Sequence, residues 1–193
     1  TVIPNGEGAG FTPTAVWLDE EEHLVVGSRA LSRVRSDPDN VLTGFVKQLG
    51  SGELLRFARS SQVADPTDLV AALIRSLRAD ATRRLGHYVE DAVLTAPSRF
   101  GPKQRQALAV AARKAGLVYS PLLQEPIAAA LAYGGPSEGA TWLVYHFAGR
   151  SFDAALVTRE GGVVEVVSHA FDDRLGGDQL DWEIVRKVFV PAV

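Results

Sequence analysis

Apolar residues recur at intervals of three and four along residues 69–81, and this spacing predicts an amphipathic helix. Residues 65–68 (Asp-Pro-Thr-Asp) open this helix, and Gly86 ends it. Similar signals predict a second helix from Gly101 to Gly116. The apolar stripe of the first helix, which we expect to lie in a core, consists of Leu69, Val70, Leu73, Ile74, Leu77 and Ala81.

Short apolar segments bounded by turn residues predict strands in the first two thirds of the chain. Residues 14–18 and 23–27 flank four acids and are expected to form a β-hairpin with a solvated acidic turn. Residues 89–95 and 117–123 read as strands on either side of the second helix, with the first strand buried on both faces. Strand, helix and strand in this order imply parallel pairing.

The last third of the chain is predicted to be rich in β-structure. Residues 141–147, 151–158 and 163–170 are expected to form an antiparallel meander. A final helix is expected to be capped at or near Asp178 and to end near Pro191. Its predicted inward-facing residues are Leu180, Ile184, Val185 and Val188.

Between these parts, residues 124–134 read as a loop with one acid, a short alanine-rich helix and a glycine stop. Pro126 suits the first helical turn, and Gly134 suits a left-handed cap. Glu125 therefore sits where a rigid element begins. Its carboxylate can orient a water or a metal-bound water, or it can simply complement the helix dipole.

Composition excludes several classes of protein. The chain has 193 residues, of which 46% are hydrophobic, enough for a substantial core. A net charge of −3 does not suggest broad nucleic-acid binding, and no apolar run approaches the ~20 residues that span a bilayer. Cysteine is absent, which agrees with a cytoplasmic protein. Methionine is absent and the chain opens on Thr1, so we expect a fragment of a longer polypeptide.

Several motifs together resemble the heat-shock protein 70 (DnaK-type) chaperones in their ATPase domain. The stretch Gln124 to Gly134 resembles the family's Asn-Glu-Pro-Thr-Ala-Ala-Ala-Leu-Ala-Tyr-Gly segment. Further similar segments follow in family order: residues 3–14, the lysine-bearing residues 45–50, Thr95-Ala96-Pro97 with residues 104–107, Ser151-Phe152-Asp153, and residues 175–178.

The resemblance implies an α/β fold, a partial actin-like ATPase domain built from ribonuclease-H-like units. Residues 1–134 would form most of the first lobe, with 28–88 as its peripheral helical subdomain. Residues 135–193 would start the second lobe with the meander and a helix, after the linker at residues 134–139.

The resemblance also implies roles for individual residues. Glu125 would position the attacking water, and Lys47 would face the γ-phosphate. Pro97, Arg105 and Asp153 would belong to the interlobe relay of nucleotide state. The phosphate-binding residues would be His146, Gly149, Arg150 and Ser151.

The chain departs from the family at its second phosphate loop. The family's Asp-Leu-Gly-Gly-Gly-Thr-Phe-Asp is replaced by residues 146–153, so His146 stands for the leading acid and one glycine of three is kept. Imidazole does not suit the water shell of magnesium, and Arg150 either clashes with phosphate or makes a bidentate contact to it. Arg99 also replaces an aromatic residue of the relay surface.

The functional expectation is a nucleotide-binding domain fragment of a heat-shock-70-like chaperone, with ATP or ADP and Mg²⁺ as cofactors of the intact parent. Peptide clients and co-chaperones are implied as partners of that parent, and nucleic acid and membranes are not. The alternative is a catalytically impaired pseudo-ATPase that acts as a protein-interaction or regulatory module. A sugar kinase or filament protein of the actin-like class is a further alternative. We expect the fragment alone not to turn over ATP.

Overall fold

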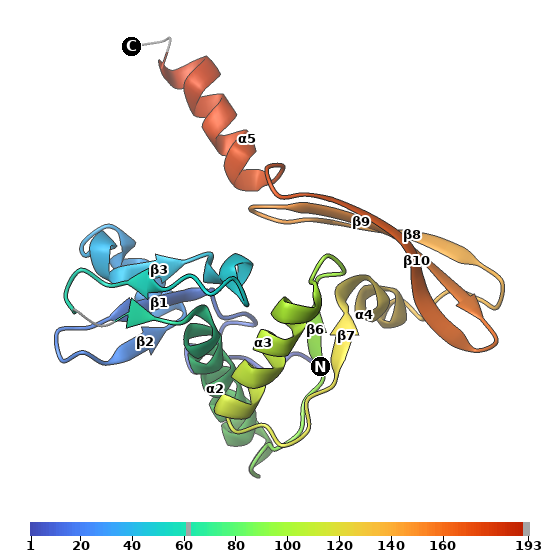
Figure 1. The fold of residues 1–193 in the computed structure, drawn as a ribbon, viewed down its shortest axis with the longest axis horizontal. Coiled ribbons are helices and arrows are strands. Elements are labelled where there is room, and N and C mark those ends of the chain that lie inside the picture. Colours follow the sequence, from blue (N-terminus) through green and yellow to red (C-terminus); the bar gives the residue numbers. More distant parts are fainter. Residues whose placement is uncertain (61–62, 191–193) are drawn as a thin grey trace. The chain divides into compact units, whose positions relative to one another are not determined.

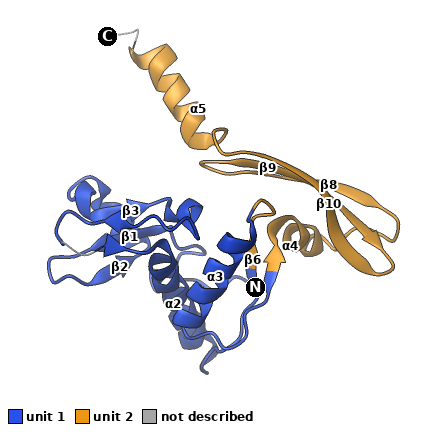
Figure 2. Cartoon of the chain, viewed as in Figure 1, with its two compact units in different colours: residues 1–94, 100–122 blue, residues 95–99, 123–193 orange. Residues whose placement is uncertain are grey.

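The computed structural model describes residues 1–60 and 63–190 of the chain (Figure 1). It divides into two compact units, coloured separately in Figure 2. Unit 1 comprises Thr1–Leu94 and Phe100–Leu122, and unit 2 comprises Thr95–Arg99 and Leu123–Val193. The lobes that the resemblance implies, residues 1–134 and 135–193, are a different division and stay a prediction. The expected end near Pro191 lies outside the described residues.

Unit 1 begins with an irregular segment and a three-stranded sheet. β1 (Ala15–Leu18) pairs antiparallel with both β2 (Leu24–Val26) and β3 (Val41–Thr43), which confirms the predicted hairpin. Ala15 and Val16 are fully buried on β1. The smaller elements that follow are α1 (Ser28–Leu31), η1 (Ser32–Val34), η2 (Pro38–Asn40), η3 (Phe45–Gln48), β4 (Leu55–Arg56) and β5 (Val63–Ala64).

Two helices, α2 (Pro66–Leu85) and α3 (Pro102–Lys114), pack against each other in unit 1. The Asp65 side chain accepts a hydrogen bond from the Thr67 backbone amide at 2.7 Å, and Gly86 takes the left-handed conformation that ends α2. The predicted stripe is buried at Leu69, Val70, Leu73 and Ile74. The prediction is wrong for Leu77, which is 49% exposed, because it lines an open pocket together with Ile3 and Phe11 of the irregular N-terminal segment.

The predicted strands at residues 89–95 and 117–123 are much shorter in the structure. Regular strand is confined to β6 (Leu94–Ala96) and β7 (Leu122–Gln124), which form a two-stranded sheet. Before them, a single parallel bridge joins Asp91 and Tyr119, so the predicted parallel direction is confirmed there. Burial on both faces was wrong, since Val93 is 63% exposed.

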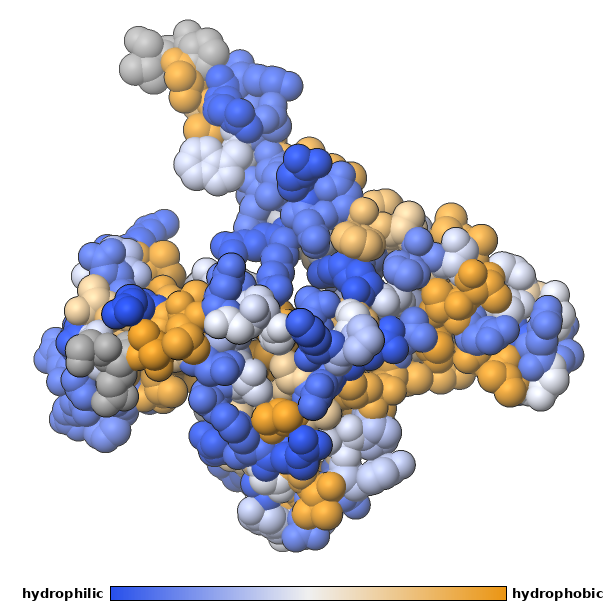
Figure 3. Space-filling view, in the orientation of Figure 1, coloured by the Kyte–Doolittle hydropathy of each residue, from blue (hydrophilic) through white to orange (hydrophobic). Residues whose placement is uncertain are grey.

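Unit 2 holds α4 (Glu125–Ala132) and an antiparallel meander of β8 (Thr141–Phe147), β9 (Phe152–Glu160) and β10 (Val163–Asp172). The strand order β10-β9-β8 confirms the predicted meander. Figure 3 shows apolar side chains on the surface over these strands, and the sheet exposes Leu143, Tyr145, Phe147 and Leu156.

The last elements are α5 (Gly177–Ile184) and a π-helical turn, η4 (Val185–Phe189). Gly176 holds the N-cap position without a side-chain bond, and Asp178 lies in the first turn, so the helix begins near Asp178 as predicted, with a glycine as its cap. The expectation of an inward apolar face was wrong: Leu180, Ile184 and Val188 are each about half exposed, at 48%, 49% and 57%. Among the described residues, no helix is long and apolar enough to cross a membrane.

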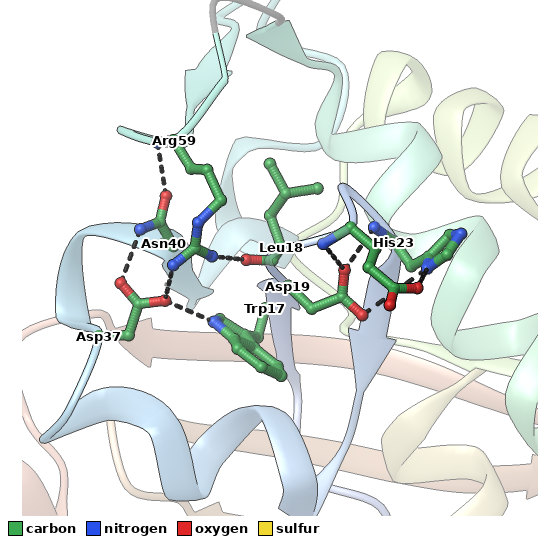
Figure 4. A network of polar contacts seen from close by, with 8 residues as sticks. Trp17, Leu18, Asp19, His23, Asp37, Asn40 and Arg59 are labelled. Carbon is green, nitrogen blue, oxygen red and sulfur yellow. Dashed lines mark hydrogen bonds and ion pairs between the residues drawn. The ribbon is translucent and has the colours of Figure 1, made fainter.

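A polar network in unit 1 gathers around the carboxylate of Asp37 (Figure 4). Asn40 Nδ2 donates to one oxygen at 2.6 Å, and Trp17 Nε1 donates to the other at 2.8 Å. Arg59 forms an ion pair with the same carboxylate at 2.7 Å and also donates to the Leu18 carbonyl oxygen. The Asn40 and Trp17 hydrogen bonds, joined by Arg59, lower the pKa of Asp37 from 3.8 to about 2.

This network predicts an acid-dependent loss of stability in unit 1. A lowered pKa means that the unfolded chain binds more protons than the folded chain between the two pKa values. The contribution of Asp37 is therefore complete above pH 3.8 and is lost as the pH falls toward about 2. We expect the melting temperature of Asp37→Asn to depend less steeply on pH in this window than that of the native chain. Parallel curves for the two proteins would contradict the prediction.

Candidate functional site

Glu125 is the first residue of α4, one position further into the helix than the sequence predicted. Pro126 follows it in the first turn, where its missing amide proton is not needed. Gly134, beyond the helix end, has a φ of 96°, the left-handed conformation that the sequence predicted. Burial of the Glu125 side chain raises its pKa; the positive charges of His146 and Arg99 oppose this shift, and the negative charge of Asp153 adds to it.

A cavity of about 270 Å³ lies beside Glu125, wholly within unit 2. Glu125, Thr95 and Ser98 line it, and so do His146 of β8, Asp153 of β9 and His169 of β10. Within the described part of the chain, the Ser98 hydroxyl is buried and has no hydrogen-bond partner. A buried, unsatisfied hydroxyl is costly, so a polar ligand in this cavity would gain from bonding to it.

Asp153 is held in place by residues from three segments of unit 2. Arg99 Nη1 lies 2.5 Å from Asp153 Oδ1, and the Ser151 hydroxyl lies 3.4 Å from Oδ2. His146 is the cross-strand neighbour of Asp153 in the pairing of β8 with β9. The side chains of Arg99 and Asp153 are only 15% and 23% exposed, so this ion pair is screened less than a surface pair.

The turn between β8 and β9, residues 148–151, is hydrogen-bonded to the start of α5. The amides of Gly177 and Asp178 donate to the carbonyl oxygens of Ala148 and Gly149, at 3.0 and 2.8 Å. Arg150 Nε pairs with Asp178 Oδ2 at 2.9 Å. Two backbone carbonyl oxygens of the turn therefore accept hydrogen bonds from α5, and the guanidinium of Arg150 forms an ion pair with Asp178.

The close approach of Gly176 to this turn predicts the effect of a single methyl group. A Cβ at Gly176 would lie 2.5 Å from the Gly149 oxygen and 2.8 Å from the Arg150 nitrogen, so backbone would have to move. We expect Gly176→Ala to lower the stability of unit 2 by about 1–3 kcal/mol, measured by urea denaturation.

Gly177→Ala is the matched control, because its Cβ would lie 3.8 Å from Gly149 Cα, an ordinary contact. Amide hydrogen exchange at Asp178 should accelerate in Gly176→Ala alone. Equal behaviour of the two alanine variants would contradict the close approach.

A model of the family described as Hsp70 protein matches residues 1–190 of the chain. The chain belongs to the Hsp70 family. Its fold is accordingly part of the actin-like ATPase fold, and it is an Hsp70-like nucleotide-binding domain, as the sequence predicted. Hsp70 proteins are ATP-binding chaperones that generally take ATP or ADP with Mg²⁺.

The structure brings some of the predicted Hsp70 site residues together. Glu125, His146 and Asp153 line one cavity, and Gly149, Arg150 and Ser151 lie in the turn between two of its strands. Pro97 lies in the unit 2 segment that also carries Arg99.

Two predicted residues belong to unit 1. Lys47 lies in η3, and Arg105 lies in α3, where its Nε donates to the Phe100 carbonyl oxygen at 2.8 Å.

Sequence reasoning missed two residues of this site, Ser98 and His169, and it missed the ion pair of Arg99 with Asp153. Ser98 directly follows Pro97 in the segment that resembles the family, and this position next to a predicted site residue was the sequence signal that could have identified it. Nothing local in the sequence marks His169 or the pairing of Arg99 with Asp153, which are 54 residues apart.

The residues of the cavity do not suit Mg²⁺ as the family uses it. Magnesium needs hard oxygen ligands or their hydrogen bonds to its water shell, and His146 supplies an imidazole instead. Both oxygens of Asp153 already face protein partners, Arg99 and Ser151. Among the described residues, no group of three or more acids and histidines is arranged to hold a metal ion.

Proposed function

We propose that this chain is the nucleotide-binding part of an Hsp70-like chaperone whose unit 2 cavity receives the terminal phosphate of ATP. The observation that carries the proposal is the cavity itself, with a half-buried Glu125 and the unpartnered hydroxyl of Ser98 on its wall. We assign to Ser98 a hydrogen bond to the ligand. The DnaK-like character and a cytoplasmic location are part of the same proposal, as are peptide clients and co-chaperones of the parent.

Glu125 has the properties that a water-orienting base needs. It begins a short helix, so its backbone is fixed, and burial raises its pKa toward the range where a carboxylate accepts a proton effectively. The attack on phosphate depends mainly on positioning and on neutralisation of charge. In unit 1, we assign to Lys47 the role of an ammonium that neutralises phosphate charge.

The remaining assigned residues concern the turn and the coupling of nucleotide state. Gly149 and Ser151 are proposed to contact phosphate, and His146 to face it from β8. Pro97, Arg105 and Asp153 are proposed to transmit nucleotide state. Because the Arg150 guanidinium already pairs with Asp178, a phosphate that uses Arg150 has to compete with that carboxylate. We therefore propose hydrolysis slower than in a glycine-rich loop.

The alternative function is an interaction module with a non-hydrolysing nucleotide fold. The exposed apolar residues of the meander favour it, since contiguous exposed apolar surface marks interaction sites. The replacement of an acid by His146 favours it as well.

Ligand-induced stabilisation separates the two functions. Ligand that binds the native state raises its melting temperature by mass action. We expect ATP to raise the melting temperature of the full-length protein, and GTP or free adenosine to raise it less. The absence of any rise at millimolar ATP would reject nucleotide binding and leave the interaction module. The isolated chain is expected to show no multiple-turnover hydrolysis, which a standard phosphate-release assay measures.

A further inference from the structure

Arg99 is a fixed positive charge next to the cavity. Its Nη1 lies 2.5 Å from Asp153 Oδ1, and its Nε lies 3.5 Å from Asp173 Oδ1. Its guanidinium also lies 5.8 Å from the ring centroid of Phe171, so a ring and two acids fix it. A guanidinium does not lose its proton in proteins, so this charge is present at every working pH.

The replacement of the family's leading acid by His146 also removes negative charge from the surroundings of Asp153. His146 is the cross-strand neighbour of Asp153. An imidazole carries no negative charge, whereas the acid that the family has at this position is an anion. Asp153 therefore pairs with the guanidinium of Arg99, and its cross-strand neighbour is an imidazole and not a second carboxylate. Of the two acids that line the cavity, Glu125 and Asp153, Asp153 is paired with a cation of the chain itself, Arg99.

The ion pair of Arg99 with Asp153 reduces the attraction of this site for a divalent cation. Mg²⁺ keeps its waters and is attracted by carboxylates that are not already neutralised. Here the carboxylate of Asp153 is neutralised by Arg99, and a metal would compete with an ion pair that is largely shielded from solvent.

We propose that the unit 2 cavity binds the phosphate group of its nucleotide without a divalent cation, because Arg99 supplies positive charge at Asp153, and His146 stands where a second carboxylate would otherwise attract such a cation. This inference rests on the proposed nucleotide binding and changes its metal requirement. Arg99 acts here as a positioning residue, through Asp153.

The test compares ATP binding to the full-length protein in excess EDTA and in millimolar MgCl₂, by calorimetry or fluorescence. We expect the two dissociation constants to agree within about threefold, since tenfold corresponds to only about 1.4 kcal/mol. Binding that is tenfold or more tighter with MgCl₂ would overturn the inference and leave the proposed function intact. Absence of ATP binding under both conditions would reject both.

Two variants sharpen the result. His146→Asp adds an acid beside Asp153 and is expected to create Mg²⁺ dependence, with ATP binding at least about tenfold weaker in EDTA than in MgCl₂. His23→Asp makes the same exchange at an exposed site of unit 1 and should leave the ratio unchanged. Arg99→Lys should keep the ratio of the dissociation constants in EDTA and in MgCl₂ near one, because lysine preserves the positive charge. Arg99→Gln should raise this ratio, because glutamine is neutral. Equal ratios in all four variants and the native protein would overturn the assignment to Arg99 and His146.

Discussion

Glutamine in place of Glu125 is expected to lower single-turnover ATP hydrolysis by the full-length protein by about 10²–10⁴-fold. Glutamine has nearly the shape of glutamate but no carboxylate to orient a water or accept its proton. The loss should lie in the chemical step, so the affinity for ATP should change little. A rapid-quench assay at saturating ATP measures the rate, and calorimetry measures the affinity.

Glu160→Gln is the matched control. Glu160 is exposed at the end of β9, and its substitution by glutamine removes the same negative charge away from the cavity. The native rate itself should fall as the pH drops through the raised pKa of Glu125, because only the ionised form acts as a base. Glu125→Gln should abolish this pH dependence. An unchanged rate in Glu125→Gln would remove Glu125 from the chemistry.

The double variant His146→Asp/Arg150→Gly shows whether the altered loop limits the rate. If the native protein hydrolyses no ATP and the double variant does, the loop is switched off within a competent scaffold, and Glu125→Gln should then be measured in that background. If both are silent, the interaction module becomes the better description of the parent.

The helices of this chain could be predicted from sequence because their signals are local. Asp65 caps the start of α2 through its own side chain, and Gly86 ends it in a left-handed conformation that a side chain would resist. Strands depend on partners that lie elsewhere in the chain. The neighbours of Val93, Ala92 and Leu94, donate backbone hydrogen bonds to Tyr119 and Pro121, and yet the Val93 side chain is exposed. The β propensity of a residue does not specify whether the face it lies on is covered.

The amphipathic pattern of the last helix illustrates a second limit. The spacing of Leu180, Ile184 and Val188 correctly indicates a helical segment with an apolar face, but all three are exposed. Periodicity identifies the face of a helix and does not identify what covers it.

The candidate site could be predicted only as far as contiguous motifs reach. The segment around Glu125 and the altered loop at residues 146–153 are visible in the sequence, and so is the replacement of an aromatic residue by Arg99. The partner of Arg99 is not, because Asp153 reaches it through the fold. The same holds for the contact of Gly176 with Gly149, which depends on two backbone segments meeting.

Gly50→Ala is expected to destabilise unit 1 by about 2–5 kcal/mol, the sum of a backbone term and a packing term. Gly50 has a φ of 70°, where a side chain costs about 1–2 kcal/mol. Its Cβ would also lie 2.8 Å from both the carbonyl carbon and the carbonyl oxygen of Lys103, near the start of α3. Forcing that backbone apart adds about 1–3 kcal/mol. Urea denaturation of the chain measures the sum.

Gly52→Ala separates the two terms, because Gly52 also has a positive φ, 81°, but a Cβ there would meet nothing within 4 Å. It should cost only the backbone term, so the difference between the two variants reports the contact with α3. Gly50 follows η3, which carries Lys47, and Leu49 between them is only 1% exposed. Movement of Gly50 away from Lys103 would therefore shift the segment that presents Lys47. If the two variants unfold at the same urea concentration, Gly50 does not fix this segment against α3, and contacts other than that of Gly50 with Lys103 position Lys47.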